Sequence, residues 1–274
     1  MMVSSMNTPT LLKLHTHSNQ HGSEMAKVAK KKVIIVIVEG PSDEEALSYN
    51  LQKMYATLNK DVIFKVVHCD LTTEEVSKKG IAVLVGDVIK NVLTKQKWKP
   101  SDVYAVFQIT DTDGAYVPDS SIEEDSSCKK IVYKENGIVC QNKEGVIRRN
   151  KLKSRNINTL CKKSYFLIKT VKIPYKIVYM SSCLEHVLFD KVNCTDLEKE
   201  KLAELFDLSC SDNQDLFYKF FTEEEFVVDG GYAETWSYIK QGNRSLQRFT
   251  NLRFLFPSLG EDGDVSVISG RNES

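Results

Sequence analysis

The feature that most constrains the fold is a run of six apolar residues, Val33–Val38, that ends on Glu39. Such a run of β-branched side chains is typical of a strand buried on both faces, as in a parallel sheet. A Gly-Pro pair then breaks the strand, and Ser42 or Asp43 can cap a following helix. Ligand crevices in open α/β sheets lie beyond the carboxyl ends of strands, so Glu39 is expected at a crevice. The simpler alternative is a solvated glutamate at a strand end.

A second segment repeats this design, because the apolar strand at 102–110 ends in Asp111 and Asp113. Alternate side chains of a strand share a face, so we expect these two carboxylates to point the same way. Two such groups repel unless a cation lies between them, and oxygen-only ligands favour Mg²⁺ or Mn²⁺. A polar turn is the simpler interpretation, since Asp-x-Asp-Gly is also a common loop composition. Acids after two separate strands favour the metal site.

The order of elements predicts the fold class. A helix over 43–58, a strand over 62–67 and a helix over 81–96 separate the two acidic strands. This alternation is typical of right-handed crossovers, so we expect an α/β protein with a mostly parallel sheet flanked by helices.

A further strand at 175–180 leads into a helix that Ser181 or Ser182 would cap. Glu185, in the first turn of that helix, is another acid just beyond a strand end. It is a candidate metal ligand, although a favourable charge at a helix N-terminus also explains it.

We expect four regions along the chain of 274 residues. They are a disordered leader at 1–30, an α/β domain at 31–190 with an insertion at about 118–172, a helical region at 191–258, and a mobile tail at 259–274. In the helical region we expect helices at 197–205, 216–221 and 246–256 that pack on the sheet, with their aromatic residues in the core.

Composition narrows the function classes. Lys plus Arg and Asp plus Glu both count 37, so the net charge gives no global attraction to nucleic acid. The seven cysteines form no Cys-x-x-Cys pair, which argues against a zinc ribbon and for reduced thiols in a cytoplasmic protein. No apolar run approaches the roughly 18 residues of a membrane span.

The insertion contains a predicted hairpin and the chain's most basic segment. Strands at 131–133 and 138–140 flank an Asn-Gly turn. A basic segment follows, with Tyr165 and Phe166 close behind. A charge run is usually a solvated face, but basic residues with aromatic neighbours can also track phosphates, with an affinity that falls steeply with salt. The candidate nucleic-acid-binding residues are Arg148, Arg149, Lys151, Lys153, Arg155, Lys162 and Lys163.

Three segments carry a family resemblance. Glu-Gly-x-Ser-Asp after the first strand and Asp-x-Asp after a later one resemble the TOPRIM fold of topoisomerases, primases and OLD-type nucleases. Within that superfamily the chain is most similar to RloB-like proteins of bacterial defence loci, over about 31–190. The segment 180–188 resembles their Asn-Pro-x-Phe-Glu-x-Trp-Leu-Leu signature, with Ser181-Ser182 in place of Asn-Pro.

The resemblance implies a Mg²⁺- or Mn²⁺-dependent nuclease, acting on DNA or RNA, in an anti-phage system. It assigns catalysis to Glu39, Asp111 and Asp113, and metal binding to these three with Asp43 and Glu185. Such proteins often work with an ATPase, which would be a separate subunit because this chain has no G-x-x-x-x-G-K-[ST] motif. A homo-oligomer is left open.

Two alternatives compete with this interpretation. Asp111-Thr112-Asp113-Gly114 also matches the nucleophile motif of haloacid-dehalogenase-like phosphatases, in which Asp111 would form an aspartyl-phosphate and Asp113 would be the acid/base. That motif normally belongs to the first strand, and it leaves Glu39 without a role. The other alternative is a non-catalytic TOPRIM-like module that binds a partner or nucleic acid.

Overall fold

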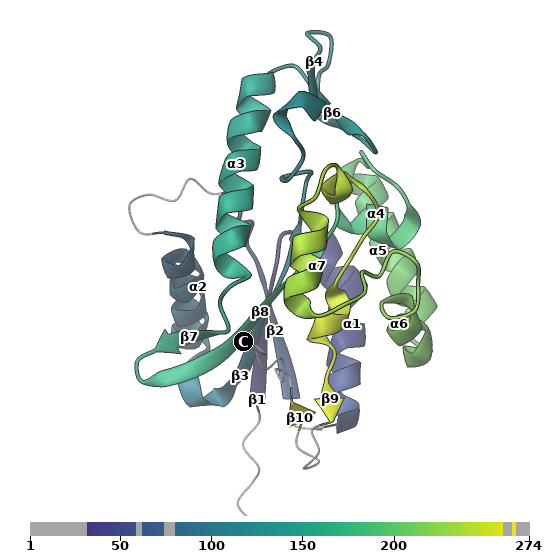
Figure 1. The fold of residues 1–274 in the computed structure, drawn as a ribbon. Helices are drawn as coiled ribbons and strands as arrows, with labels where there is room; N and C mark the ends of the chain where they lie inside the picture. The colour runs from purple at the N-terminus through teal and green to yellow at the C-terminus, as the bar shows by residue number, and fades with distance from the viewer. Residues whose placement is uncertain (1–31, 59–61, 74–79, 260–264, 267–274) are drawn as a thin grey trace, which may run out of the picture.

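The computed structural model describes residues 32–58, 62–73, 80–259 and 265–266 (Figure 1). The predicted leader at 1–30 lies outside the described residues. Of the predicted mobile tail, Leu259 pairs in β9 (Ser258–Leu259) with β10 (Val265–Ser266), and the remaining residues lie outside the description.

A five-stranded sheet of order β2-β1-β3-β8-β7 forms the centre of the molecule. Its strands are β1 (Lys32–Val38), β2 (Val62–His68), β3 (Val103–Asp111), β7 (Tyr165–Ile168) and β8 (Val171–Met180). β1 pairs in parallel with β2 and β3, β3 pairs in parallel with β8, and β7 alone is antiparallel. The predicted α/β class with a mostly parallel sheet is therefore confirmed.

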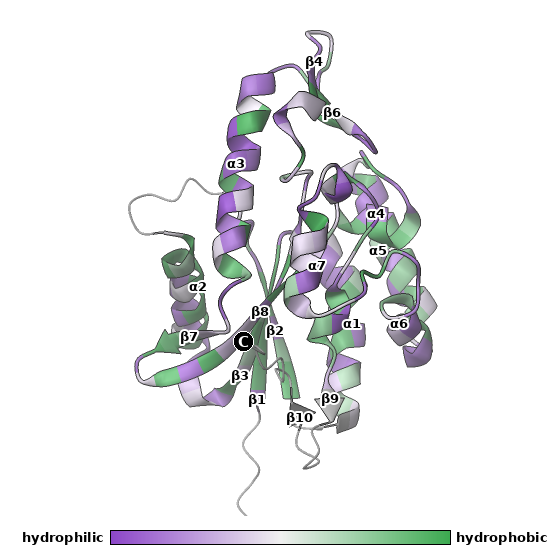
Figure 2. Ribbon diagram, viewed as in Figure 1, coloured by the Kyte–Doolittle hydropathy of each residue, from purple (hydrophilic) through white to green (hydrophobic). Residues whose placement is uncertain are grey.

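Helices cover both faces of this sheet because successive residues of β1 point to opposite sides. Ile34, Val36 and Val38 pack under α1 (Pro41–Leu58), α4 (Leu184–Phe189), α5 (Asp196–Cys210) and α6 (Gln214–Phe220). Val33, Ile35 and Ile37 face α2 (Ile81–Gln96), the C-terminal part of α3 (Lys143–Leu160) and α7 (Tyr232–Ile239). The apolar strands lie between these two layers in Figure 2.

The helical region after residue 190 is divided between the two faces. α5 and α6 pack around Phe206, Phe217 and Phe221, which are buried, so the prediction that these aromatic residues form core is confirmed. The predicted helix at 246–256 is wrong. Two short 3₁₀ helices, η3 (Arg244–Leu246) and η4 (Leu252–Leu255), occur there instead. Between them, Thr250 bridges to the end of β8, and the Asn251 side chain accepts a hydrogen bond from the β8 backbone.

The insertion has a small core of its own, shared by β4 (Ile122–Glu124), β5 (Val132–Lys134), β6 (Gly137–Cys140) and the start of α3. The predicted hairpin is confirmed as β5 and β6. Its Asn-Gly turn is wrong, because Lys134 pairs with Gly137 and leaves Glu135 and Asn136 as the turn residues. α3 was not predicted, and it stands above the carboxyl edge of the sheet in Figure 1. Within the described ranges, no helix is both long and apolar enough to cross a membrane.

Candidate functional site: a carboxylate cluster at the sheet edge

Five acidic residues gather where β1, β3 and β8 end, and we name them the carboxylate cluster. They lie close enough that the charge of one carboxylate raises the pKa of another. The cluster consists of Glu39, Asp43, Asp111, Asp113 and Glu185.

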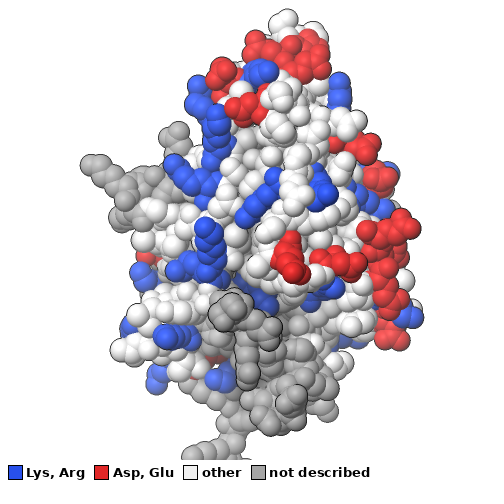
Figure 3. All heavy atoms as spheres, viewed as in Figure 1, with Lys and Arg blue, Asp and Glu red and all other residues white. Residues whose placement is uncertain are grey.

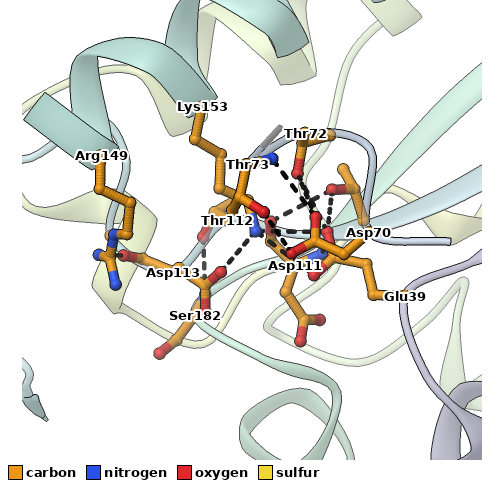
Figure 4. Close-up of polar contacts among 12 residues, drawn as sticks. Glu39, Asp70, Thr72, Thr73, Asp111, Thr112, Asp113, Arg149, Lys153 and Ser182 are labelled. Carbon is orange, nitrogen blue, oxygen red and sulfur yellow. Dashed lines mark hydrogen bonds and ion pairs between the residues drawn. The ribbon is translucent and has the colours of Figure 1, made fainter. Parts of the chain in front are cut away.

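Glu39 is fixed by donors from β3 and from the loop after β2. Its Oε1 accepts hydrogen bonds from the Thr110 hydroxyl, from the Asp111 backbone N–H at 3.2 Å and from the Thr72 hydroxyl at 3.4 Å. The parallel register of β1 and β3 brings these groups together, because Ile37 pairs with Gln108 just before both strands end. Glu39 therefore points inward along the carboxyl edge, as Figure 4 shows, and is not a solvated strand end.

Asp111 and Asp113 are not placed by strand alternation, because β3 ends at Asp111 and Asp113 has a left-handed φ of 47°. A turn holds them instead. The Thr112 backbone N–H donates to the Met180 carbonyl, and the Asp113 N–H donates to the Ser182 carbonyl, both at 2.9 Å. The carboxyl ends of β3 and β8 are thereby tied together.

A buried lysine lies between two of the carboxylates. The side chain of Lys153 is fully buried, and its Nζ contacts Glu39 Oε1 at 3.3 Å, Glu39 Oε2 at 3.4 Å and Asp113 Oδ2 (Figure 4). The prediction that Lys153 belongs to a nucleic-acid-binding surface is therefore wrong. It belongs to the carboxylate cluster, where it compensates the charge of two acids.

Lys153 reaches the cluster because one polar face of α3 is docked on the strand ends. Arg149 Nη2 donates to the Asp113 carbonyl at 3.0 Å, and Asn150 Nδ2 donates to the Gly114 carbonyl at 3.2 Å. One turn beyond Lys153, Asn156 Nδ2 donates to the Thr72 carbonyl at 3.0 Å. Arg149 and Asn150 lie one turn before Lys153, and Asn156 lies one turn after it, so all four share one side of the helix.

The other half of the cluster consists of Asp43 and Glu185. Asp43 Oδ2 accepts the Gly40 backbone N–H at 2.8 Å, which closes the loop between β1 and α1. Glu185 is 2% exposed, and its Oε2 has no hydrogen-bond partner, although Lys199 Nζ of α5 lies 3.9 Å away. The predicted serine cap of this helix is wrong. Cys183 is the N-cap residue, because Ser182 adopts a left-handed φ of 59° to join the Asp113 turn.

Burial and crowding shift the acidity of the cluster in different directions. Burial raises the pKa of Glu39 to about 7 and that of Asp43 to about 6, with Lys153 opposing the shift at Glu39. Burial and the neighbouring Asp43 and Glu39 raise the pKa of Asp111. Burial also acts on Asp113, but the contact with Lys153 outweighs it and holds the pKa of Asp113 below its ordinary value. Burial therefore favours the protonated form of Glu39, whereas the contact with Lys153 favours the ionised form of Asp113.

The donor set fits Mg²⁺ or Mn²⁺ in chemistry, because it consists of carboxylate oxygens and includes the unpartnered Oε2 of Glu185. The present side-chain positions do not close a metal site. Over the part of the chain that the structure describes, no three His, Cys, Asp or Glu side chains are placed to hold one ion together. Instead Glu39 and Asp113 meet at an ammonium group.

The remaining predicted nucleic-acid-binding residues differ in how far their side chains are exposed to solvent. Arg148, Lys151, Arg155 and Lys162 are exposed, whereas Arg149 and Lys163 are half-buried. Lys151 pairs with Asp119 at 3.0 Å, and Lys163 lies 5.2 Å from the centre of the Phe166 ring. In Figure 3 basic side chains follow the edge formed by α3, so its outer face has the charge needed to bind phosphates.

Three residues that contact the carboxylate cluster escaped the sequence patterns. Thr72 and Thr110, which orient Glu39, have no motif that would single them out. Lys199 belongs to a helix predicted only as packing.

Comparisons of the chain with protein-family models, curated proteins and solved structures find no significant match. The TOPRIM resemblance thus rests on the three sequence segments quoted above.

Proposed function

We propose that this chain is a Mg²⁺- or Mn²⁺-dependent nuclease that hydrolyses phosphodiester bonds of DNA or RNA at the carboxylate cluster. The observation that carries the proposal is the position of Glu39, Asp111 and Asp113. Segments about seventy residues apart bring them to the same carboxyl edge of a parallel sheet. There, Glu39 and Asp113 both contact the ammonium group of Lys153. A divalent ion bound there would stabilise the charge of the phosphate and lower the pKa of bound water.

The protein's own groups have distinct tasks in this proposal. Glu39 has one of two tasks: as an acid/base it exchanges a proton at the pKa of about 7 that burial gives it, and as a ligand of a divalent ion it is held ionised. Asp113 stays ionised and serves as a negatively charged ligand. Asp111 lies between the two halves of the cluster, since both Glu39 and Asp43 act on its pKa.

The outer face of α3 provides a route for the substrate. Arg148, Lys151 and Arg155 recur every three or four residues on the exposed side of the helix whose inner side holds the cluster. A nucleic-acid backbone bound along this face would pass close to the acids. Such binding would be independent of sequence and sensitive to salt.

The acidity pattern also bears on the phosphatase alternative. In that mechanism Asp113 would be the acid/base, yet its pKa is lowered by Lys153, whereas that of Glu39 is raised. Glu39 is therefore the better proton-exchanging group, and the nuclease is favoured. By analogy with RloB-like proteins, the nuclease would be an anti-phage effector, and an ATPase subunit would be its partner.

The test is cleavage of plasmid DNA, single-stranded DNA and RNA in Mn²⁺ or in EDTA, with and without a candidate ATPase subunit. We expect the wild type to cut at least one substrate in Mn²⁺ only. Glu39→Gln and Asp111→Asn should lower the rate by at least roughly a hundredfold. The matched controls are Glu45→Gln, exposed on α1, and Asp87→Asn on α2, which should keep the wild-type rate.

Two outcomes would contradict the proposal. Cleavage in EDTA, or cleavage that survives Asp111→Asn, would assign the activity elsewhere. Hydrolysis of a small phosphate monoester that survives Glu39→Gln and is lost in Asp111→Asn would identify the phosphatase instead.

A further inference from the structure

The charge of the carboxylate cluster is compensated by a residue of α3. Among the described residues, Lys153 is the only buried lysine or arginine, and none of its side chain is exposed. Its Nζ lies against both oxygens of Glu39 and against Asp113, which is where a cation shared by those two carboxylates would lie. The ammonium group carries one positive charge among three neighbouring acids, Glu39, Asp111 and Asp113.

The acids on either side are held more firmly than the lysine. Glu39 is oriented by donors from Thr110, Asp111 and Thr72, and Asp113 lies in a turn hydrogen-bonded to β8. The four-carbon side chain of Lys153 is the part with rotational freedom. A doubly charged ion also compensates three carboxylates better than one ammonium does.

We propose that Lys153 is a resident counter-ion of the carboxylate cluster, and that a divalent cation binds between Glu39 and Asp113 only in exchange for its ammonium group. Lys153 thus sets the cation affinity of the site. This inference rests on the proposed function, because it concerns the same metal-binding carboxylates.

In the other half of the cluster, at Asp43 and Glu185, a cation would not have to displace a hydrogen-bonded lysine. Glu185 Oε2 has no hydrogen-bond partner, and Lys199 Nζ is 3.9 Å away, outside hydrogen-bond distance. A cation beside Asp43 and Glu185 therefore displaces no directly bonded ammonium. The exchange applies to the Glu39 and Asp113 half alone.

The experiment is a calorimetric titration of Mn²⁺ into the full chain, comparing the wild type with Lys153→Met. Methionine retains the shape of the stem and removes the charge. We expect Lys153→Met to bind Mn²⁺ roughly tenfold more tightly or better, because no ammonium has to leave. Lys95→Met, exposed on α2, is the matched control and should bind Mn²⁺ like the wild type.

If the wild type binds Mn²⁺ and Lys153→Met binds it equally or more weakly, the proposed exchange is wrong. The nuclease proposal would remain intact. Absence of Mn²⁺ binding in both proteins would overturn the metal site itself, and the proposed function with it. Should Lys153→Met fail to fold, labelling of the wild type decides. Reductive methylation read by mass spectrometry should leave Lys153 unmodified in EDTA and modify it in Mg²⁺, and continued protection in saturating Mg²⁺ would overturn the exchange.

Discussion

Glu39 should make the metal-free protein less stable as the pH rises. Its pKa in the folded chain is raised from 4.5 to about 7, with burial as the main cause. Between these values the folded chain retains a proton that the unfolded chain has released, so unfolding releases protons and the free energy of unfolding falls with rising pH. The side chain is 17% exposed, so solvent screening is limited. At about 1.4 kcal/mol for each pH unit, the interval of about 2.5 units corresponds to about 3.5 kcal/mol, most of which is lost between pH 4.5 and 8.

Glu39→Gln removes this titration, so the comparison isolates one group from others that titrate in the same range. From pH 4.5 to pH 8, the wild type should lose about 2–3 kcal/mol more of its free energy of unfolding than the variant does. Urea denaturation in EDTA, followed by circular dichroism, measures it. Glu45→Gln, on the exposed side of α1, should keep the wild-type pH dependence. Parallel pH profiles for Glu39→Gln and the wild type would refute the reasoning.

Three further predictions follow from the fold and the surface. Gly114→Ala should lower the free energy of unfolding by about 2–4 kcal/mol in urea, because Gly114 has a φ of 65° and a Cβ there would lie 2.6 Å from Leu246 Cδ2. Phe217→Ala should cost about 3–5 kcal/mol by leaving a cavity beside Phe206, while Mn²⁺ affinity measured by calorimetry stays unchanged. Replacing Arg148 and Arg155 together by serine should weaken nucleic-acid binding and reduce the slope of log K against log salt by about 1–2 in fluorescence anisotropy, and an unchanged slope would remove α3 from the binding surface.

The sheet and its acidic edge could be predicted because their signals are local. The apolar run at 33–38 has one structural interpretation, and the carboxyl ends of parallel strands meet at one edge whatever the loops do. Glu39 and Asp111 were therefore placed from sequence. The Asp113 turn was not, since it depends on hydrogen bonds to Ser182, about seventy residues further along the chain.

α3 was missed because the side it buries is partly polar. Asn150, Lys153 and Asn156 occupy buried positions that apolar residues usually fill, so hydrophobic periodicity does not reveal the helix. Lys153 also cannot be distinguished by residue type from the exposed Lys151. The two lysines differ because α3 packs on the strand ends with Lys153 on its inner side and Lys151 on its outer side.

The helix predicted at 246–256 failed for a related reason. Leu246, Leu252 and Leu255 do lie in the core, as their apolar spacing indicated. The polar residues between them oppose a continuous helix, because Thr250 and Asn251 bond to β8 instead. Long-range hydrogen bonds of this kind override local spacing.

The central claim is that the carboxylate cluster binds a divalent cation, and anomalous scattering from a crystal soaked in Mn²⁺ tests it most directly. The account predicts an anomalous peak in contact with Asp111 and at least one of Glu39, Asp43, Asp113 and Glu185, and no such peak in Asp111→Asn. A wild-type crystal at saturating Mn²⁺ with no peak among these five residues would contradict it.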